Sequence, residues 1–341
     1  MCAGGVRKFR RASEVCKPAG MSPQPWQTLP DRMALLRRRN LLAAGVRGFF
    51  TARGYMEVET PYAVPAPGEE VHLQARPAGD KWLHTSPEFA MKKLLAGGAG
   101  PIFQLARVWR DEPWSDTHAP EFTMLEWYDL HADMAALMQE TFALLQSVLP
   151  PEVAFKGIVT KLDEPIFLTV AEAFFRYVGA DVLASAGDAR ALADQAKVGL
   201  REGETWEDLF FRLMLERVEP HLGQERTTFL THWPVAQAAL ARRCPQDPRV
   251  AERFELYVCG MELANAFVEL TDAAEQRARF IEDRARRHRL YGGDDWSLDE
   301  AFLAAVEKLP ACAGIALGFD RLVMLAAGAR RIADVLWLPE G

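Results

Sequence analysis

The sequence lacks the patterns that define several classes of protein. It has no apolar run of about 18 residues, the length that a membrane-spanning helix needs, so we expect no membrane span. Its five cysteines include no Cys-x-x-Cys pair and its seven histidines are scattered, which argues against a disulfide framework and a zinc site. It has no internal repeat and no low-complexity segment. These absences favour a reduced, cytoplasmic globular protein.

The composition is ordinary for a folded domain. Hydrophobic residues make up 49% and charged residues 26% of the 341 positions. The net charge of −7 argues weakly against a protein whose main role is to hold nucleic acid, because such proteins usually have a basic face. Residues 1–20 are basic but lack the continuous apolar stretch of a secretory signal. We expect residues 1–25 to be a disordered extension and residues 26–341 to form the folded domain.

The hydrophobic patterns predict helices inserted between neighbouring strands. Asp31 is predicted to cap a helix that runs to about residue 53, and a strand over residues 55–60 follows it. Residues 131–225 are mostly helical in pattern, with Thr169 as a cap and Gly179 as a stop. The predicted strands cover residues 101–111, 121–130, 227–233, 254–270 and 314–317, and Gly318 begins the last helix. Strands that pair with their sequence neighbours indicate the α+β class rather than a doubly wound parallel sheet.

The strand predicted over residues 121–130 carries polar groups on one face. Because side chains alternate along a strand, Phe122, Met124, Glu126 and Tyr128 point to the same side. For Glu126 alone, the simpler explanation is a solvent-facing residue of an edge strand.

The preceding strand favours a binding site over a solvent-facing strand. It ends in Arg110 and Glu112, and the loop that joins the two strands contains His118. An arginine, carboxylates, a tyrosine and a histidine on one surface would suit an anionic phosphate and a cationic amine bound together.

A second cluster contains three glutamates spaced seven residues apart, Glu255, Glu262 and Glu269. A helix with a solvated acidic stripe would give the same spacing. Gly260 and the β-branched and aromatic neighbours suit strands better, and on a strand Asn265 and Glu269 share a face. Acidic groups among apolar neighbours need cations, so magnesium or an ammonium group is expected there.

The third cluster is the strand-to-helix turn in GIALGFDRLVML, residues 314–325. Gly318 permits a ligand to approach the backbone, and Arg321 falls in the first turn of the following helix. Such a turn suits a polyphosphate or adenine. Taken alone it is a weak signal, because a plain turn with a surface arginine has the same sequence pattern.

Together these segments resemble the three signature motifs of class II aminoacyl-tRNA synthetases, and the lysyl branch in particular. The matching stretches are GYMEVETP (54–61) for motif 1, VWRDE (108–112) with HAPEFTMLEWY (118–128) for motif 2, GIALGFDRL (314–322) for motif 3, and TSPEFAMKKLL (85–95) and ELANAFVELTD (262–272) for the lysyl pattern. The resemblance runs from about residue 29 to residue 338. It implies an α+β catalytic domain with an antiparallel sheet flanked by helices, and a homodimer built through motif 1.

The resemblance also implies a role for each matching residue. Arg110 and Arg321 would be catalytic, with Arg110 clamping the α-phosphate and the amino-acid carboxylate. The implied ATP site comprises Arg110, Asp111, Glu112, His118, Phe122, Glu262, Leu263, Gly318 and Arg321. The implied amino-acid site comprises Ser86, Pro87, Glu88, Glu126, Tyr128, Asn265, Glu269 and Ala316. Glu255 and Glu262 would hold Mg²⁺.

Within these sites the resemblance assigns particular contacts. Phe122 and Arg321 would enclose the adenine ring. Glu88 would meet the amine nearest the substrate carboxylate, and Glu269 with Tyr128 would meet the distal ammonium. No covalent enzyme nucleophile is needed, because the substrate carboxylate attacks the α-phosphate and the protein supplies positioning and electrostatics.

The resemblance is nearest to lysyl paralogues that modify a protein. Only about 30 residues precede the motif 1 helix, whereas an anticodon-binding barrel needs roughly a hundred. Such paralogues activate (R)-β-lysine with ATP and attach it to a lysine side chain of elongation factor P. Ala316 and the segment 232–242 agree with them. The resemblance therefore implies (R)-β-lysine or lysine as substrate, elongation factor P as acceptor, and no tRNA partner.

Two other functions remain open at this point. A stand-alone lysyl-tRNA synthetase core would charge tRNA and would favour glycine at Ala316. A catalytically inactive regulatory paralogue would be expected to have lost Arg110, Glu262 or Arg321, and all three are present. Ala119 replaces the asparagine usual after the motif 2 histidine, which removes one contact to ATP.

Overall fold

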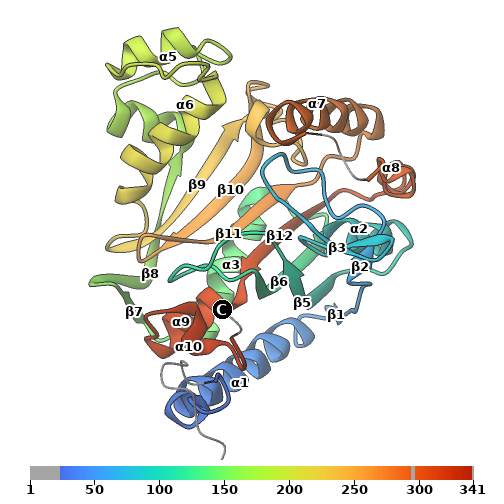
Figure 1. Cartoon of the computed structure of the whole chain (residues 1–341), viewed down its shortest axis with the longest axis vertical. Coiled ribbons are helices and arrows are strands. Elements are labelled where there is room, and N and C mark those ends of the chain that lie inside the picture. The colour runs from blue at the N-terminus through green and yellow to red at the C-terminus, as the bar shows by residue number, and fades with distance from the viewer. Residues whose placement is uncertain (1–23, 293–295, 340–341) are drawn as a thin grey trace, which may run out of the picture.

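A large sheet forms the centre of the molecule in the computed structural model, which describes residues 24–292 and 296–339. Its nine strands lie in the order β1-β5-β6-β12-β11-β10-β9-β8-β7 (Figure 1). They are β1 (Met56–Glu57), β5 (Ile102–Trp109), β6 (Glu121–Leu130), β7 (Glu152–Phe155), β8 (Ile158–Thr169), β9 (Arg226–Pro234), β10 (Val250–Val258), β11 (Met261–Val268) and β12 (Cys312–Gly318). The pairing is antiparallel except between β1 and β5 and between β8 and β9 within the described residues. The predicted α+β class is confirmed.

Helices surround this sheet (Figure 1). They are α1 (Leu29–Thr51), α2 (Glu88–Ala96), α3 (Met134–Val148), α4 (Val170–Ala173), α5 (Ala189–Ala196), α6 (Trp206–Leu213), α7 (Ala273–Tyr291), α8 (Glu300–Val306), α9 (Phe319–Ala327) and α10 (Ile332–Val335). A small second sheet contains β2 (Ala63–Val64), β4 (Lys81–Leu83) and β3 (Arg76–Ala78). No helix in the described part of the chain is both long and apolar enough to cross a membrane.

The two faces of the sheet have different partners. On β6, Leu125 and Trp127 pack into the main hydrophobic core with residues of α1, α3 and α9. The alternate residues Glu126 and Tyr128 line a cavity on the opposite side. This division follows from the two-residue period of a strand, as the sequence predicted for β6.

Two local predictions differ from the structure and two are confirmed. The cap of α1 is Thr28 rather than Asp31, because Pro30 occupies one of the first two helical positions, where its missing N–H costs no hydrogen bond. The helical prediction for residues 131–225 fails over residues 152–169, where the chain forms β7 and β8. Thr169 does cap α4, and Gly179 does end the π-helical segment Phe174–Val178 with φ of 79°. The predicted extension over residues 1–25 falls almost entirely outside the described residues.

A buried ion pair connects α1 to the start of α9. The Arg39 guanidinium on α1 contacts the carboxylate of Asp320 and donates to Thr123 Oγ1 at 2.9 Å. Asp320 also accepts from the Thr123 backbone N–H at 2.7 Å. Because Asp320 lies in the first turn of α9, these bonds fix the start of the helix that carries Arg321.

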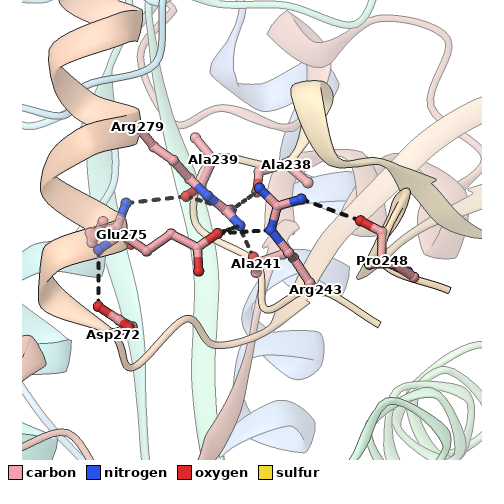
Figure 2. A network of polar contacts seen from close by, with 9 residues as sticks. Ala238, Ala239, Ala241, Arg243, Pro248, Asp272, Glu275 and Arg279 are labelled. Atoms are coloured by element: carbon pink, nitrogen blue, oxygen red, sulfur yellow. Dashed lines mark hydrogen bonds and ion pairs between the residues drawn. The ribbon is translucent and has the colours of Figure 1, made fainter. Parts of the chain in front are cut away.

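A second network holds α7 against the loop that follows β9 (Figure 2). One Arg279 nitrogen, Nη1, donates to the carbonyl oxygens of Ala238, Ala239 and Ala241 at 2.7, 3.1 and 2.9 Å. Arg279 Nη2 forms an ion pair with Glu275 at 2.7 Å. Ala238 and Ala239 line the cavity, so this network fixes one of its walls.

Candidate active site

A cavity of about 520 Å³ lies on the sheet face opposite the main core. Its lining includes most of the predicted site residues, namely Ser86, Glu88, Arg110, Glu112, His118, Phe122, Glu126, Tyr128, Glu262, Leu263, Asn265, Glu269, Ala316, Gly318 and Arg321. They come from the strands β6, β11 and β12, the loop before β6, the turn into α2, the residue that follows β11, and the first turn of α9. Segments that are far apart in the sequence therefore meet at one site.

Three predicted site residues, Asp111, Pro87 and Glu255, take positions outside the cavity lining. Asp111 is exposed and forms an ion pair with Arg76 at 3.0 Å. Pro87 is the N-cap of α2, so it shapes the turn between Ser86 and Glu88 rather than the cavity wall. Glu255 lies on β10 next to the strand that carries Glu262.

Glu126 lies between two hydroxyl donors. It is 1% exposed, and its carboxylate accepts from Ser86 Oγ and from Tyr128 Oη, both at 2.7 Å. Burial, followed by the negative charge of Glu88, raises the pKa of Glu126 to about 8. The solvent-facing alternative is wrong, because β6 is an interior strand between β5 and β12. A cationic ligand would favour the ionised form of this carboxyl.

The sequence prediction did not include Lys92, which occupies the centre of the acidic end of the site. Its ammonium lies 2.5 Å from Glu88 Oε1 and 2.5 Å from Glu269 Oε2. Burial alone lowers the pKa of Lys92, but attraction to Glu269 and Glu88 outweighs it and leaves the pKa raised. The spacing of Glu88 and Lys92, four residues apart on a helix, was the signal in the sequence that could have identified the pair.

Gly314 is a second residue that the sequence prediction did not assign to the site. A Cβ at this position would meet Tyr128 Cε1 at 2.2 Å and Glu269 Oε1 at 2.6 Å. Only glycine therefore leaves room for both side chains, and Gly314 itself lines the cavity.

Arg110 lies at the basic end of the cavity, opposite the acidic end. Its guanidinium carbon lies 5.4 Å from the ring centre of Phe122. Its buried Nε has no hydrogen-bond partner in the described part of the chain. A buried cationic donor without a partner is costly, so Arg110 is suited to an anionic ligand.

Arg321 and His118 form one unit at the same end. Arg321 donates to the Glu262 carbonyl oxygen at 2.7 Å, and its Nη2 lies 2.9 Å from His118 Nε2. A guanidinium only donates, so Nε2 accepts and Nδ1 of His118 carries the proton, which it donates to Ser115 Oγ at 2.9 Å. Desolvation, followed by the charge of Arg321, lowers the pKa of His118 and keeps the ring neutral.

The two predicted magnesium ligands lie on adjacent strands. Glu255 on β10 is buried and accepts from Arg253 at 2.5 Å and from Tyr257 Oη at 2.7 Å. Burial, followed by the charge of Glu262, raises the pKa of Glu255 to about 7. Glu262 lines the cavity, whereas Glu255 lies beside it.

These carboxylates can take part in a magnesium site only together with a ligand. Over residues 24–292 and 296–339, no group of three His, Cys, Asp or Glu side chains could hold a metal alone. Mg²⁺ commonly uses one or two carboxylates together with substrate phosphates. Glu262, with Glu255 beside it, fits a magnesium site that substrate phosphates complete.

Arg253 also orients Asn265, the residue predicted to contact the substrate carboxylate. Its Nε donates to Asn265 Oδ1 at 3.1 Å, which leaves the amide nitrogen as the donor for a ligand. Asn265 pairs with Ala316 across β11 and β12, and Ala316 pairs with Glu126 across β12 and β6. These three neighbours form a continuous floor between the basic and acidic ends of the cavity.

Comparisons with known proteins agree with this arrangement. Residues 28–341 match the family model of class II tRNA synthetases (D, K and N). The elongation factor P–(R)-β-lysine ligase of Proteus mirabilis strain HI4320 is 42% identical over 329 residues, which cover 92% of this chain and 97% of that protein. Proteins of the same name from Pectobacterium carotovorum strain PC1 and Salmonella typhi are 44% and 43% identical, each over 96% of its own length and over 91% and 92% of this chain.

Proposed function

Because the chain belongs to the class II tRNA synthetase family (D, K and N), we propose that it activates (R)-β-lysine or lysine with ATP and transfers it to a lysine side chain of elongation factor P. The observation that carries this proposal is the meeting of Arg110, Glu262, Glu269 and Arg321 around one cavity. Arg110 and Arg321 suit the phosphates of a nucleotide, Glu262 suits the magnesium bound to those phosphates, and Glu269 suits an ammonium group of a diamine.

The first step joins the amino acid to AMP. An oxygen of the substrate carboxylate forms a bond to the α-phosphorus of ATP, and the bond from that phosphorus to the bridging oxygen of pyrophosphate breaks. Arg110 is the donor for the charge that develops on the α-phosphate, since its guanidinium has an unused buried N–H within the described residues. Arg321, fixed by Glu262 and His118, is placed to hold the nucleotide beside Phe122.

The second step transfers the acyl group. The neutral amine of the acceptor lysine attacks the carbonyl carbon of the adenylate, AMP leaves, and the amine gives up one proton. The product is an amide bond. Neither step requires an enzyme nucleophile, so the work of the chain is to orient two substrates and to exclude water.

The acidic end of the cavity supports a substrate with two amino groups. Glu88, Glu126 and Glu269 all line it, whereas a single-amine substrate would leave part of this charge without a counter-ion. Tyr128 donates to Glu126, so the phenol oxygen remains an acceptor for the distal ammonium.

The proposal includes Mg²⁺, held by Glu262 and Glu255 together with the phosphates. When bound, the ion neutralises the triphosphate and orients it for in-line attack. It also includes a homodimer formed through α1, a cytoplasmic location where ATP and translation factors are present, and a single catalytic domain over residues 26–341.

The two alternative functions have less support. The relatives with 42–44% identity all carry the name of a protein-modifying ligase, which does not favour a tRNA-charging enzyme. An inactive paralogue would not need Arg110, Glu262 and Arg321 on one surface.

Amino-acid-dependent exchange of radioactive pyrophosphate into ATP tests the activation step. We expect exchange with β-lysine or lysine and none with norleucine, which lacks the distal amine. Absence of exchange with every diamine would overturn the proposal in favour of the inactive paralogue.

A further inference from the structure

Lys92 is a buried lysine that joins the two carboxylates at the acidic end of the cavity. It is 1% exposed and lies on α2 between the buried apolar residues Met91 and Leu95. Its ammonium contacts Glu88 one helical turn earlier and Glu269, which follows β11. Glu88 and Glu269 line the cavity, so Lys92 stands behind them as a fixed internal cation.

The contacts of Lys92 leave the carboxylates able to bind a ligand. Lys92 reaches Oε1 of Glu88 and Oε2 of Glu269, one oxygen of each group. The other oxygen of Glu269, Oε1, is buried and has no hydrogen-bond partner within the described residues. It lies beside Gly314, on the cavity wall. This unpaired acceptor needs a donor, and an ammonium group of a substrate would provide one.

Charge explains why a lysine is needed here. Two buried carboxylates close to Glu126 repel each other, and without a cation at least one of them would take up a proton. A protonated carboxyl is a poor partner for an ammonium group. Burial raises the pKa of Glu269 to about 8, and attraction to Lys92 opposes this rise, so Lys92 favours the carboxylate that attracts a substrate amine.

We propose that Lys92 is a positioning residue that holds Glu88 and Glu269 at a fixed separation, favours the carboxylate form of Glu269, and so makes the site selective for an amino acid with two amino groups. This inference rests on the proposed function. Lys92 does not touch the substrate, since it acts through the two carboxylates. It is therefore a specificity determinant behind the cavity wall.

The neighbouring Lys93 provides a matched control. It lies on the same helix and forms an ion pair of the same length, 2.5 Å, but with Asp299. Its side chain is 34% exposed, against 2% for Lys92. Lys93→Met therefore removes an equivalent charge from α2 without touching the carboxylates of the site.

The experiment measures pyrophosphate exchange for Lys92→Met and Lys93→Met between pH 6.5 and pH 9. Loss of one partner of a buried charge pair should raise the KM for the diamine by about 30-fold or more in Lys92→Met, with the KM for ATP almost unchanged. This KM should fall as pH rises, because the extra proton on the carboxylates must leave before the amine binds. Lys93→Met should follow the parent protein at every pH.

Further variants separate charge from folding. Lys92→Gln keeps hydrogen-bond donors but no charge, so it should behave like Lys92→Met and serves if the methionine variant does not fold. Lys92→Arg keeps the charge and should restore the pH profile of the parent protein, with part of the affinity. A diamine KM within threefold of the parent in the neutral variants, or equal rises in the KM for ATP and for the diamine, would overturn the inference. An inactive parent protein would instead refute the proposed function.

Discussion

The ring of Tyr128 lies directly over Gly314, so that a Cβ on residue 314 would come within 2.2 Å of Tyr128 Cε1. The same Cβ would stand 2.6 Å from Glu269 Oε1. Both contacts are far shorter than real carbon contacts, so either Tyr128 or the strand must move. The part of the cavity that we propose for the distal amine is therefore shaped by the absence of a side chain at Gly314 on β12.

Gly314→Ala should weaken amino-acid binding strongly and lower the stability of the fold only moderately. Overpacking of this kind typically costs about 1–3 kcal/mol of stability, which a chain of this size can tolerate. We expect the KM for the diamine to rise by about tenfold or more, the size of effect that small changes in a pocket produce, while ATP binding changes little.

Gly199→Ala is the control for this variant. A Cβ added to Gly199 would meet no other atom of the described residues within 4 Å, and the backbone there has a conformation that other residues adopt. Its substitution should leave both KM values unchanged. Equal effects of Gly314→Ala and Gly199→Ala would contradict the role of Gly314 as a shaping residue.

Arg110→Ala should abolish adenylate formation. Loss of one preorganised donor to a developing anion typically costs about 10²–10³ in rate, and Arg110 supplies a paired, planar set of donors. Single-turnover formation of the adenylate is the measurement. Arg107→Ala is the control: Arg107 lies on β5, three residues before Arg110, and pairs with Glu121 at 3.5 Å near the surface, so this variant should retain activity. An Arg110→Ala protein with more than a tenth of the parental rate would refute the assignment.

Ala316→Gly should shift the preference from (R)-β-lysine toward α-lysine. Ala316 pairs with Glu126 and with Asn265 in the floor of the cavity, so loss of its methyl group deepens the floor between the two ends of the substrate. One methyl group in a pocket is worth about tenfold in discrimination. The ratio of kcat/KM for the two isomers checks this, with Ala266→Gly as control, because Ala266 packs into the main core. An unchanged ratio would show that residue 316 does not select the isomer.

Amino-acid binding should release a proton near neutral pH. Burial and the charge of Glu88 raise the pKa of Glu126 to about 8, so the free enzyme holds this carboxyl largely protonated at pH 7. A bound ammonium favours the carboxylate and lowers that pKa, so the proton leaves. Above about pH 9 the carboxyl is already ionised and the release should disappear.

Calorimetry in buffers with different ionisation enthalpies measures this release. Glu126→Gln has no proton to lose at this position, so the dependence of its binding enthalpy on the buffer should be smaller than in the parent protein; Glu269, whose pKa burial also raises to about 8, accounts for the remainder. Proton release of the same size in Glu126→Gln would mean that another group is responsible.

The sequence predicted the parts of the fold whose signals are local. The alternation in residues 121–130 placed Glu126 and Tyr128 on one face, and the structure confirms this. Long-range pairing was not predictable in the same way. Nothing near Glu126 in the sequence indicates that β12 pairs with the second edge of β6. The solvent-facing alternative was therefore reasonable until the strand order was known.

The missed features have similar physical causes. Strands β7 and β8 fall in a stretch predicted to be mostly helical, although β7 has the buried and exposed alternation of a strand, because helical patterns on both sides dominate that stretch. Lys92 and Gly314 were missed because their roles depend on residues from other elements. The role of Lys92 depends on its contact with Glu269, and the role of Gly314 depends on the ring of Tyr128 beside it. Neither contact can be read from the local sequence.

In the proposed function, this enzyme joins an activated diamine to a protein. Intact-mass measurement of unmodified elongation factor P, after incubation with the enzyme, ATP and (R)-β-lysine, tests it most directly, with a tRNA-charging assay run beside it. We expect a mass increase equal to one lysine residue on the factor, no such increase when the Arg110→Ala enzyme is used, and no charged tRNA. An unchanged mass of the factor together with lysylated tRNA would contradict it.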